Sequence, residues 1–368
     1  MNKTITALAI MMASFAANAS VLPETPVPFK SGTGAIDNDT VYIGLGSAGT
    51  AWYKLDTQAK DKKWKALAAF PGGPRDQATS AFIDGNLYVF GGIGKNSEGL
   101  TQVFNDVHKY NPKTNSWVKL MSHAPVGMAG HVTFVHNGKA YVTGSVNQNI
   151  FNGYFEDLNE AGKDQTAVDK INAHYFDKKA EDYFFNKFLL SFDPSTQQWS
   201  YAGESPWYGT AGAAVVNKGD KTWLINGEAK PGLRTDAVFE LDFTGNNLKW
   251  NKLAPVSSPD GVAGGFAGVS NDSLIFAGGA GFKGSRENYQ NGKNYAHEGL
   301  KKSYSADIHL WHNGKWDKSG ELSQGRAYGV SLPWNNSLLI IGGETAGGKA
   351  VTDSVLITVK DNKVTVQN

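Results

Sequence analysis

The sequence predicts an all-β protein, a six-bladed β-propeller whose blades are four-stranded antiparallel sheets. Short apolar strands run into glycine six times, in residues 41–46, 87–92, 140–145, 222–227, 274–279 and 338–343. Five of these strands are followed, after a turn, by a tryptophan: Trp64, Trp117, Trp199, Trp250 and Trp316. A repeat of roughly 50 residues with this content is typical of propellers, in which each repeat forms one blade.

The second repeat shows how four strands fit into one blade. Turn residues such as Asp84-Gly85-Asn86 separate predicted strands at 78–83, 87–90, 106–110 and 117–120. Glycine after the second strand allows close backbone approach, because it has no Cβ. The tryptophan of the outer strand supplies a large apolar surface for packing between adjacent blades.

Both ends of the propeller sequence are expected to contribute to one blade. Residues 353–359 and 363–366 are predicted to form its last hairpin, although this repeat has no tryptophan. Residues 21–26 resemble the end of an outer strand, as in residues 67–71. We therefore expect the two termini to meet in one blade, which removes free strand edges. The sequence leaves open which terminus supplies the outermost strand.

Two repeats carry insertions, at residues 146–187 and 281–305. Both follow the second strand of their blade, so both are expected to project from the same face. Insertions in repeat proteins lie in loops on one face, often the binding face. We expect the first to roof part of a pocket or to contact a second subunit in a homodimer; covering an exposed edge is the alternative.

The first 19 residues have the pattern of a cleaved signal peptide. Lys3 precedes an apolar stretch, and Ala17-Asn18-Ala19 forms a small-x-small cleavage site before Ser20. The propeller is thus expected to occupy residues 20–368 as one domain. No later stretch is apolar enough to cross a bilayer. The chain has no cysteine, which excludes disulfides and Cys-ligated metals, and the combination favours a bacterial periplasm.

Charge and composition limit the partners and the chemistry. With 35 basic and 34 acidic residues the formal net charge is +1, which argues against nucleic acid or an anionic membrane as partner. The eight histidines are scattered and give no metal-ligand spacing. No Ser-x-Asp-x-Gly-x-Thr-Trp box of the six-bladed sialidases is present.

The loop 226–234 of the fourth repeat is the strongest candidate site. It places Glu228 where other repeats have Ser47, Ile93, Val146 or Ala280, and Arg234 follows on the same loop. A carboxylate beside an arginine at a propeller mouth suits a general base next to an anion clamp, although a solvated surface ion pair is the simpler alternative. Other candidates on this face are Glu344, with the same ambiguity as Glu228, and the possible substrate-binding residues Arg75, Arg286 and Arg326.

The glycine-and-tryptophan repeat resembles the Kelch motif, with departures at Gly144-Ser145 and Asn226-Gly227. That motif fixes the fold and says little about function. Together with loops 172–176, 226–234 and 282–289, the chain resembles from end to end the bacterial N-acetylneuraminate epimerases, periplasmic sialic acid mutarotases. The resemblance implies interconversion of the α and β anomers of free sialic acid, without a cofactor, and that Glu228 and Arg234 are the essential pair.

Two questions stay open at this stage. A non-catalytic propeller that binds a glycan or a protein would have the same repeats, so it is the main alternative to an enzyme. The proton donor that complements Glu228 is not identified either: His131, His297, Tyr289 or an ordered water are the candidates.

Overall fold

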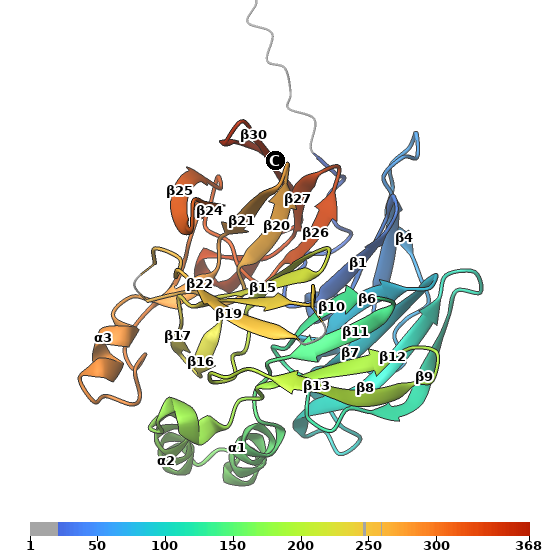
Figure 1. Cartoon of the computed structure of the whole chain (residues 1–368). Helices are drawn as coiled ribbons and strands as arrows, with labels where there is room; N and C mark the ends of the chain where they lie inside the picture. The colour runs from blue at the N-terminus through green and yellow to red at the C-terminus, as the bar shows by residue number, and fades with distance from the viewer. Residues whose placement is uncertain (1–20, 246–247, 259) are drawn as a thin grey trace, which may run out of the picture.

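The computed structural model describes residues 21–245, 248–258 and 260–368, and it forms a ring of six sheets (Figure 1). The predicted six-bladed propeller is confirmed. The predicted signal peptide, residues 1–19, lies outside the described residues. No helix in the described part of the chain is long and apolar enough to span a membrane.

Each blade is an antiparallel sheet built outward from the ring centre. Blade 1 contains β1 Thr33–Asp37, β2 Thr40–Gly44, β3 Trp52–Asp56 and β4 Lys65–Ala66. Blade 2 contains β5 Arg75–Asp76, β6 Thr79–Ile83, β7 Asn86–Lys95, β8 Thr101–Asn111 and β9 Ser116–His123. Blade 3 contains β10 Val132–His136, β11 Lys139–Thr143, β12 Phe188–Asp193 and β13 Gln198–Glu204.

The other three blades have a two-stranded hairpin between their second and third strands. Blade 4 contains β14 Ala214–Lys218, β15 Lys221–Ile225, β18 Val238–Asp242 and β19 Lys249–Leu253, with hairpin β16 Glu228–Lys230 and β17 Leu233–Arg234. Blade 5 contains β20 Phe266–Ser270, β21 Ser273–Ala277, β24 Asp307–His312 and β25 Lys315–Glu321, with hairpin β22 Ala280–Phe282 and β23 Lys302–Tyr304. Blade 6 contains β26 Val330–Trp334, β27 Ser337–Ile341, β30 Ser354–Lys360 and β31 Lys363–Gln367, with hairpin β28 Glu344–Thr345 and β29 Lys349–Ala350.

The second repeat follows the predicted outline, but its middle strands are longer than expected. The register of β7 against β8 shifts between Phe90 and Gly92, and pairing then continues to Lys95 and Thr101. A bulge of this kind lets a hairpin bend without ending. The sequence prediction ended the strand at the glycines, whereas the backbone uses them to bend.

Tryptophans pack between blades as predicted. The ring of Trp117, from blade 2, lies 5.3 Å from Trp52 of blade 1 and 5.2 Å from Phe70. Its indole N–H donates to the carbonyl of Ala68 at 2.9 Å. This contact joins the outer strand of blade 2 to the segment arriving from blade 1.

The same contact shows how the ring closes. Trp64 of blade 1 donates to the carbonyl of Pro23 at 3.0 Å, so the N-terminal segment takes the place that Ala68 has in the next blade. Thr25 N donates to Thr352 O at 2.9 Å, as Leu322 N does to Ala306 O in blade 5. The two termini therefore meet in blade 6, as expected. The C-terminal strand β31 supplies its outermost strand, and residues 21–30 continue from there into blade 1.

The first insertion is helical. It consists of α1 Gln148–Ala161, α2 Gln165–Phe176 and a 3-10 turn Ala180–Tyr183, with Asn147 and Asp164 as N-caps that accept from the amides of Ile150 and Ala167. The second insertion contains α3 Ser285–Gln290 between β22 and β23. Figure 1 shows α1, α2 and α3 on the same side of the ring, beside the hairpin β16–β17, as the sequence predicted for the two insertions. Short 3-10 turns also occur at Gly46–Ala48 and Ala346–Gly348.

Candidate functional site

A cavity of about 760 Å³ lies at the centre of the ring. Inner-strand residues of all six blades line it, among them Ala35, Thr79, Val132, Ala214, Ala267 and Val330. Charged side chains reach it too: Glu228, Arg234, Lys302 and Glu344. This volume is in the range of small-molecule sites.

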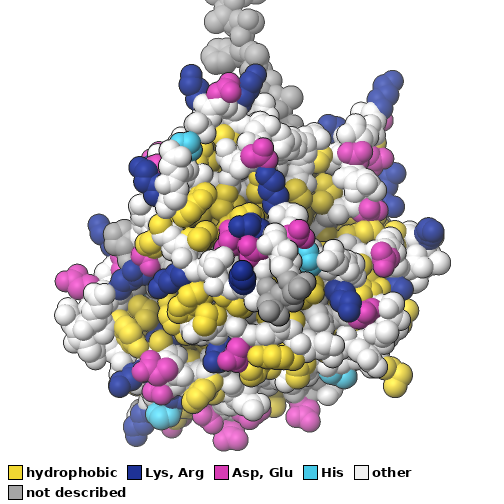
Figure 2. All heavy atoms as spheres, in the orientation of Figure 1, with side chains coloured by type: hydrophobic (Ala, Val, Ile, Leu, Met, Phe, Trp, Pro, Cys, Tyr) yellow, Lys and Arg dark blue, Asp and Glu magenta, His cyan; other side chains and the backbone are white. Residues whose placement is uncertain are grey.

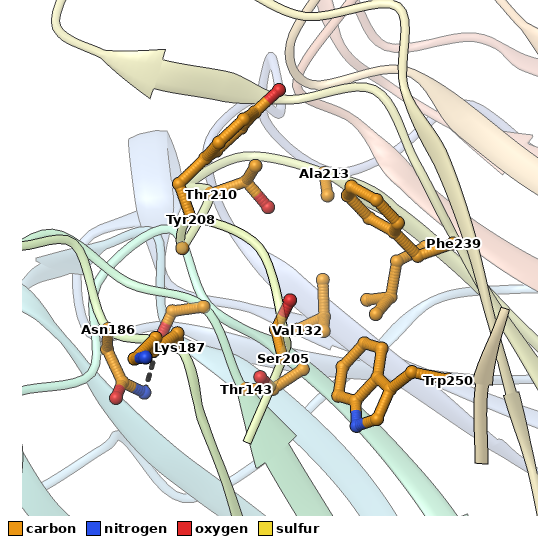
Figure 3. Close-up of a pocket in the computed structure, with 13 residues that line it drawn as sticks. Val132, Thr143, Asn186, Lys187, Ser205, Tyr208, Thr210, Ala213, Phe239 and Trp250 are labelled. Atoms are coloured by element: carbon orange, nitrogen blue, oxygen red, sulfur yellow. Dashed lines mark hydrogen bonds between the residues drawn. The ribbon is translucent and has the colours of Figure 1, made fainter. Parts of the chain in front are cut away.

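A second pocket, between blades 3 and 4, is too small for a sugar. Its free volume of about 20 Å³ is room for about one water molecule. Figure 3 shows Thr143, Ser205, Phe239 and Trp250 around it. Asn186 Nδ2 donates to the carbonyl of Gly144 at 3.0 Å at the same pocket. Two larger pockets, of about 560 and 580 Å³, lie beside the first insertion and around Arg75, and neither is lined by Glu228 or Arg234. The central cavity, which both residues line, is therefore the candidate site.

A ring of backbone hydrogen bonds surrounds the central cavity. Each blade contributes one residue with φ between 54° and 66°: Ser31, Gln77, Gly130, Gly212, Gly264 and Tyr328. Amide N–H groups donate to the preceding blade's carbonyl in four of the neighbouring pairs at 2.6–2.9 Å, and Ser31 N donates to Tyr328 O at 2.8 Å between the first and last blades. Glycine adopts this conformation without strain, whereas serine, glutamine and tyrosine do so at a cost. The cavity wall is thus fixed by the backbone itself.

Glu228 and Arg234 meet at the wall of this cavity. They are register partners across hairpin β16–β17, and their side chains form an ion pair. The Arg234 side chain is 7% exposed and that of Glu228 is 23% exposed. Arg234 Nε donates to the carbonyl of Ala280 at 3.3 Å, and its Nη2 lies 3.4 Å from the Tyr328 hydroxyl. The fold thus brings together the two residues that the sequence analysis named, and their role in a reaction stays a prediction.

Burial makes the charge of Arg234 costly, even with Glu228 as its ion-pair partner. Loss of water lowers the pKa of its guanidinium, because a low-dielectric environment disfavours the charged form. The guanidinium carbon also lies 5.4 Å from the centre of the Phe282 ring. An anion entering the cavity would relieve the cost of this buried cation.

The hairpin is held from outside by the two insertions. Lys230 is fully buried, and its Nζ donates to the carbonyls of Phe176 at 2.9 Å, Asn294 at 2.7 Å and Lys178. Burial lowers the pKa of Lys230 to about 8. The Tyr289 hydroxyl, on α3, accepts from the amide of Ala180 at 2.9 Å and joins the insertions to each other. Residues 147–187 are not among the described residues that line the central cavity; they support the hairpin β16–β17 from outside and, with Ala229, line a separate pocket of about 560 Å³.

Arg75 and Arg326 have the same structural role in two different blades. Each donates to the carbonyl of the first glycine of its doublet, Arg75 to Gly91 at 3.0 Å and Arg326 to Gly342 at 3.2 Å. Arg75 also pairs with Asp106, which lies within β8, and Arg326 pairs with Asp353, which directly precedes β30. Arg286 pairs with Asp236 at 2.9 Å. None of these three arginines is among the described residues that line the cavity.

The possible proton donors named from the sequence lie in different places in the fold, and only His131 is among the described residues that line the cavity. His131 lines the cavity, but its Nε2 is 2.6 Å from the Thr79 hydroxyl, and burial lowers its pKa to about 3. His297 packs between Phe176 and Phe282, and burial, with Arg234 and Lys230 nearby, lowers its pKa to about 4. His297 and Tyr289 are not among the described lining residues.

The cavity residues that the sequence analysis did not name include Lys302 and Tyr328. Lys302 lies at the end of the second insertion, whose sequence does not recur in the other repeats, so comparing the repeats could not predict it. Tyr328 had a detectable signal: it stands two residues after Arg326, where the matching repeats have Gly130, Gly212 and Gly264. A bulky residue in place of a left-handed glycine is unusual and points to a special role.

Metal chemistry has no visible support in the described chain, since no cluster of three or more His, Asp or Glu side chains there is suited to hold an ion. On the face seen in Figure 2, basic and acidic side chains are interspersed, as the net charge of +1 suggests.

Comparisons with known proteins agree on one family. Residues 22–366 match the family described as N-acetylneuraminate epimerase. The chain is 98% identical to N-acetylneuraminate epimerase of Escherichia coli strain K12 over 368 residues, which is all of both chains. It is 97% identical, again over the full length of both, to the enzyme of the same description from Shigella boydii serotype 4. A solved structure described as that of YjhT superposes with a TM-score of 0.94 at 98% identity, covering 95% of this chain and 100% of the other.

Proposed function

Because this chain belongs to the N-acetylneuraminate epimerase family, we propose that it is an isomerase that interconverts the α and β anomers of N-acetylneuraminic acid in its central cavity. The observation that carries the proposal is the Glu228–Arg234 pair at the wall of this cavity. The cavity is large enough for a nine-carbon sugar acid and contains a buried cation.

Glu228 acts as the base. Sialic acid is a cyclic hemiketal with a carboxylate on its anomeric carbon, and its ring opens when the anomeric hydroxyl loses a proton while the ring oxygen gains one. The open-chain ketone rotates about one bond and closes on its other face. A carboxylate positioned beside the anomeric hydroxyl is suited to remove and return this proton.

Arg234 binds the substrate carboxylate. Its guanidinium can hold a carboxylate through two parallel hydrogen bonds, which fixes the anomeric centre next to Glu228. The ion pair with Glu228 keeps the guanidinium oriented before substrate arrives. The reaction proceeds slowly in water without a catalyst, so positioning and one base are sufficient for a useful acceleration.

Replacing Glu228 by glutamine tests the base directly. Glu228→Gln keeps the size of the side chain and removes its proton affinity, so we expect acceleration of anomer exchange to be lost while binding of the sugar is largely retained. Proton NMR of freshly released α-anomer measures the exchange rate. Glu204→Gln, on a surface pair with Lys187, is the matched control and should keep wild-type activity. Wild-type exchange by Glu228→Gln would remove this residue from the mechanism.

We also infer that the mature protein is periplasmic and forms a homodimer. The signal-like residues 1–19 support export. Exposed aromatic side chains near the first insertion support self-association, since such groups are enriched at interfaces: Phe184, Phe188, Tyr201 and Tyr208 are 68%, 40%, 65% and 47% exposed. N-terminal sequencing of periplasmic protein should start near Ser20, and sedimentation at micromolar concentration should give a dimer. A monomer there would contradict the second inference.

A further inference from the structure

Tyr328 lies in a backbone conformation that a tyrosine rarely adopts. Its φ is 56°, at the ring position where three other blades have glycine. A strained residue of this kind costs about 1–3 kcal/mol and persists where the surroundings enforce it. The ring of hydrogen bonds enforces it here, through Tyr328 N to Gly264 O and Ser31 N to Tyr328 O, both at 2.8 Å.

The neighbouring blade makes room for this side chain. A Cβ on Gly264 would overlap the ring of Tyr328, so glycine at that position leaves space for the aromatic ring beside the cavity. Tyr328 is among the residues that line the cavity. Strain and space are thus both used to place one phenol group at the substrate site.

Two cations from two other blades contact this phenol. The Arg234 guanidinium lies between Tyr328 and Glu228. Its Nη1 pairs with the Glu228 carboxylate, and its Nη2 lies 3.4 Å from the Tyr328 hydroxyl. Lys302 Nζ, from blade 5, lies 4.7 Å from the centre of the Tyr328 ring. A hydroxyl that accepts a hydrogen bond from a guanidinium keeps its own proton available for donation.

We propose that Tyr328 is the proton donor to the ring oxygen of the sugar, an inference that rests on the proposed roles of Glu228 and Arg234. Glu228 takes the proton of the anomeric hydroxyl, and the bond between the anomeric carbon and the ring oxygen breaks. The ring oxygen keeps the electron pair of that bond and takes the proton of Tyr328. This leaves the open-chain keto acid, a protonated Glu228 and a phenolate beside Arg234 and Lys302. When the ring closes on the other face, both protons return along the same routes.

The other candidates are less suited to this role. His131 is held by Thr79, and His297 and Tyr289 are packed among the insertions, away from the described cavity lining. Tyr328 lines the cavity, and its hydroxyl lies 3.4 Å from the guanidinium that pairs with the base.

Tyr328→Phe tests the proposal, since it removes the hydroxyl and keeps the ring. We expect kcat for anomer exchange to fall about a hundredfold, the lower range for a general acid, with KM changed less than about threefold. Tyr53→Phe, which removes a hydroxyl on β3 of blade 1, outside the cavity lining, is the matched control and should leave kcat unchanged. Circular dichroism and thermal melting confirm that both variants are folded.

The outcomes separate this inference from the proposal on which it rests. Wild-type kcat in Tyr328→Phe together with an inactive Glu228→Gln overturns the role of Tyr328 alone. A raised KM at unchanged kcat makes Tyr328 a binding residue and also overturns it. Wild-type exchange in both variants overturns the mechanism as a whole.

Discussion

The hairpins β16–β17 of blade 4 and β28–β29 of blade 6 begin with the same residue type at the same place in the repeat. The backbone of Glu228 exchanges hydrogen bonds with Ala211, and that of Glu344 does so with Ala327. Both side chains line the central cavity. The two carboxylates are therefore equivalent by position, and any difference in their chemistry must come from their neighbours.

Those neighbours differ in number. Glu228 pairs with Arg234 from its own hairpin. Glu344 accepts from Lys30 at 2.7 Å, from Lys302 and from the Tyr304 hydroxyl, and these donors lower its pKa to about 2 against the cost of its burial. A carboxylate with three donors is a poor proton acceptor, because protonation would break all three interactions. The comparison explains why blade 4, and not blade 6, supplies the proposed base.

Among the variants that test the contrast between Glu228 and Glu344, we expect the largest effect on substrate binding from Arg234→Ala. Loss of the buried guanidinium should weaken binding of sialic acid by about 2–5 kcal/mol, the range for one partner of a desolvated charge pair. A neutral analogue without the carboxylate should lose far less. Titration calorimetry with both sugars measures the difference.

Arg286→Ala is the matched control for this experiment. Arg286 pairs with Asp236 on the partly exposed edge of the second insertion, so its loss should leave sialic acid affinity near the wild-type value. Equal losses for the acidic and the neutral sugar in Arg234→Ala would show that this arginine does not bind the carboxylate.

The fold could be predicted from the repeats. The candidate site could be predicted only in part, because residues of the N-terminal segment and of the second insertion contribute to it. Blade number and the meeting of the termini follow from local strand and turn patterns that recur six times. The repeats alone did not separate Glu228 from Glu344, and only the family resemblance pointed to Glu228. The partners that distinguish Glu344 are Lys30, from the N-terminal segment, and Lys302, from the second insertion. Contacts between segments so far apart in the chain have no local signature.

The arginines show what the repeats could have revealed about the site. Arg75 and Arg326 recur at one repeat position and bind the same glycine carbonyl, a regularity that marks them as part of the framework. Arg234 stands on a hairpin after the glycine, outside that regularity. Comparing the repeats position by position would have separated the two kinds of arginine, and would also have singled out Tyr328.

The smallest expected effect is on stability and concerns Glu344→Gln. At pH 7 the wild-type carboxylate is ionised and holds Lys30, Lys302 and Tyr304, so the variant should be less stable by on the order of 2 kcal/mol. The folded-state pKa of Glu344, about 2, lies below its ordinary value, so this stabilisation is fully present above about pH 5 and is lost as the pH falls toward 2. Urea unfolding of both proteins at pH 7, 5, 4 and 3 should therefore give a difference that shrinks with acid. A difference that stays constant over this range would mean that Glu344 contributes through packing and not through its charge, and its contrast with Glu228 would then need another explanation.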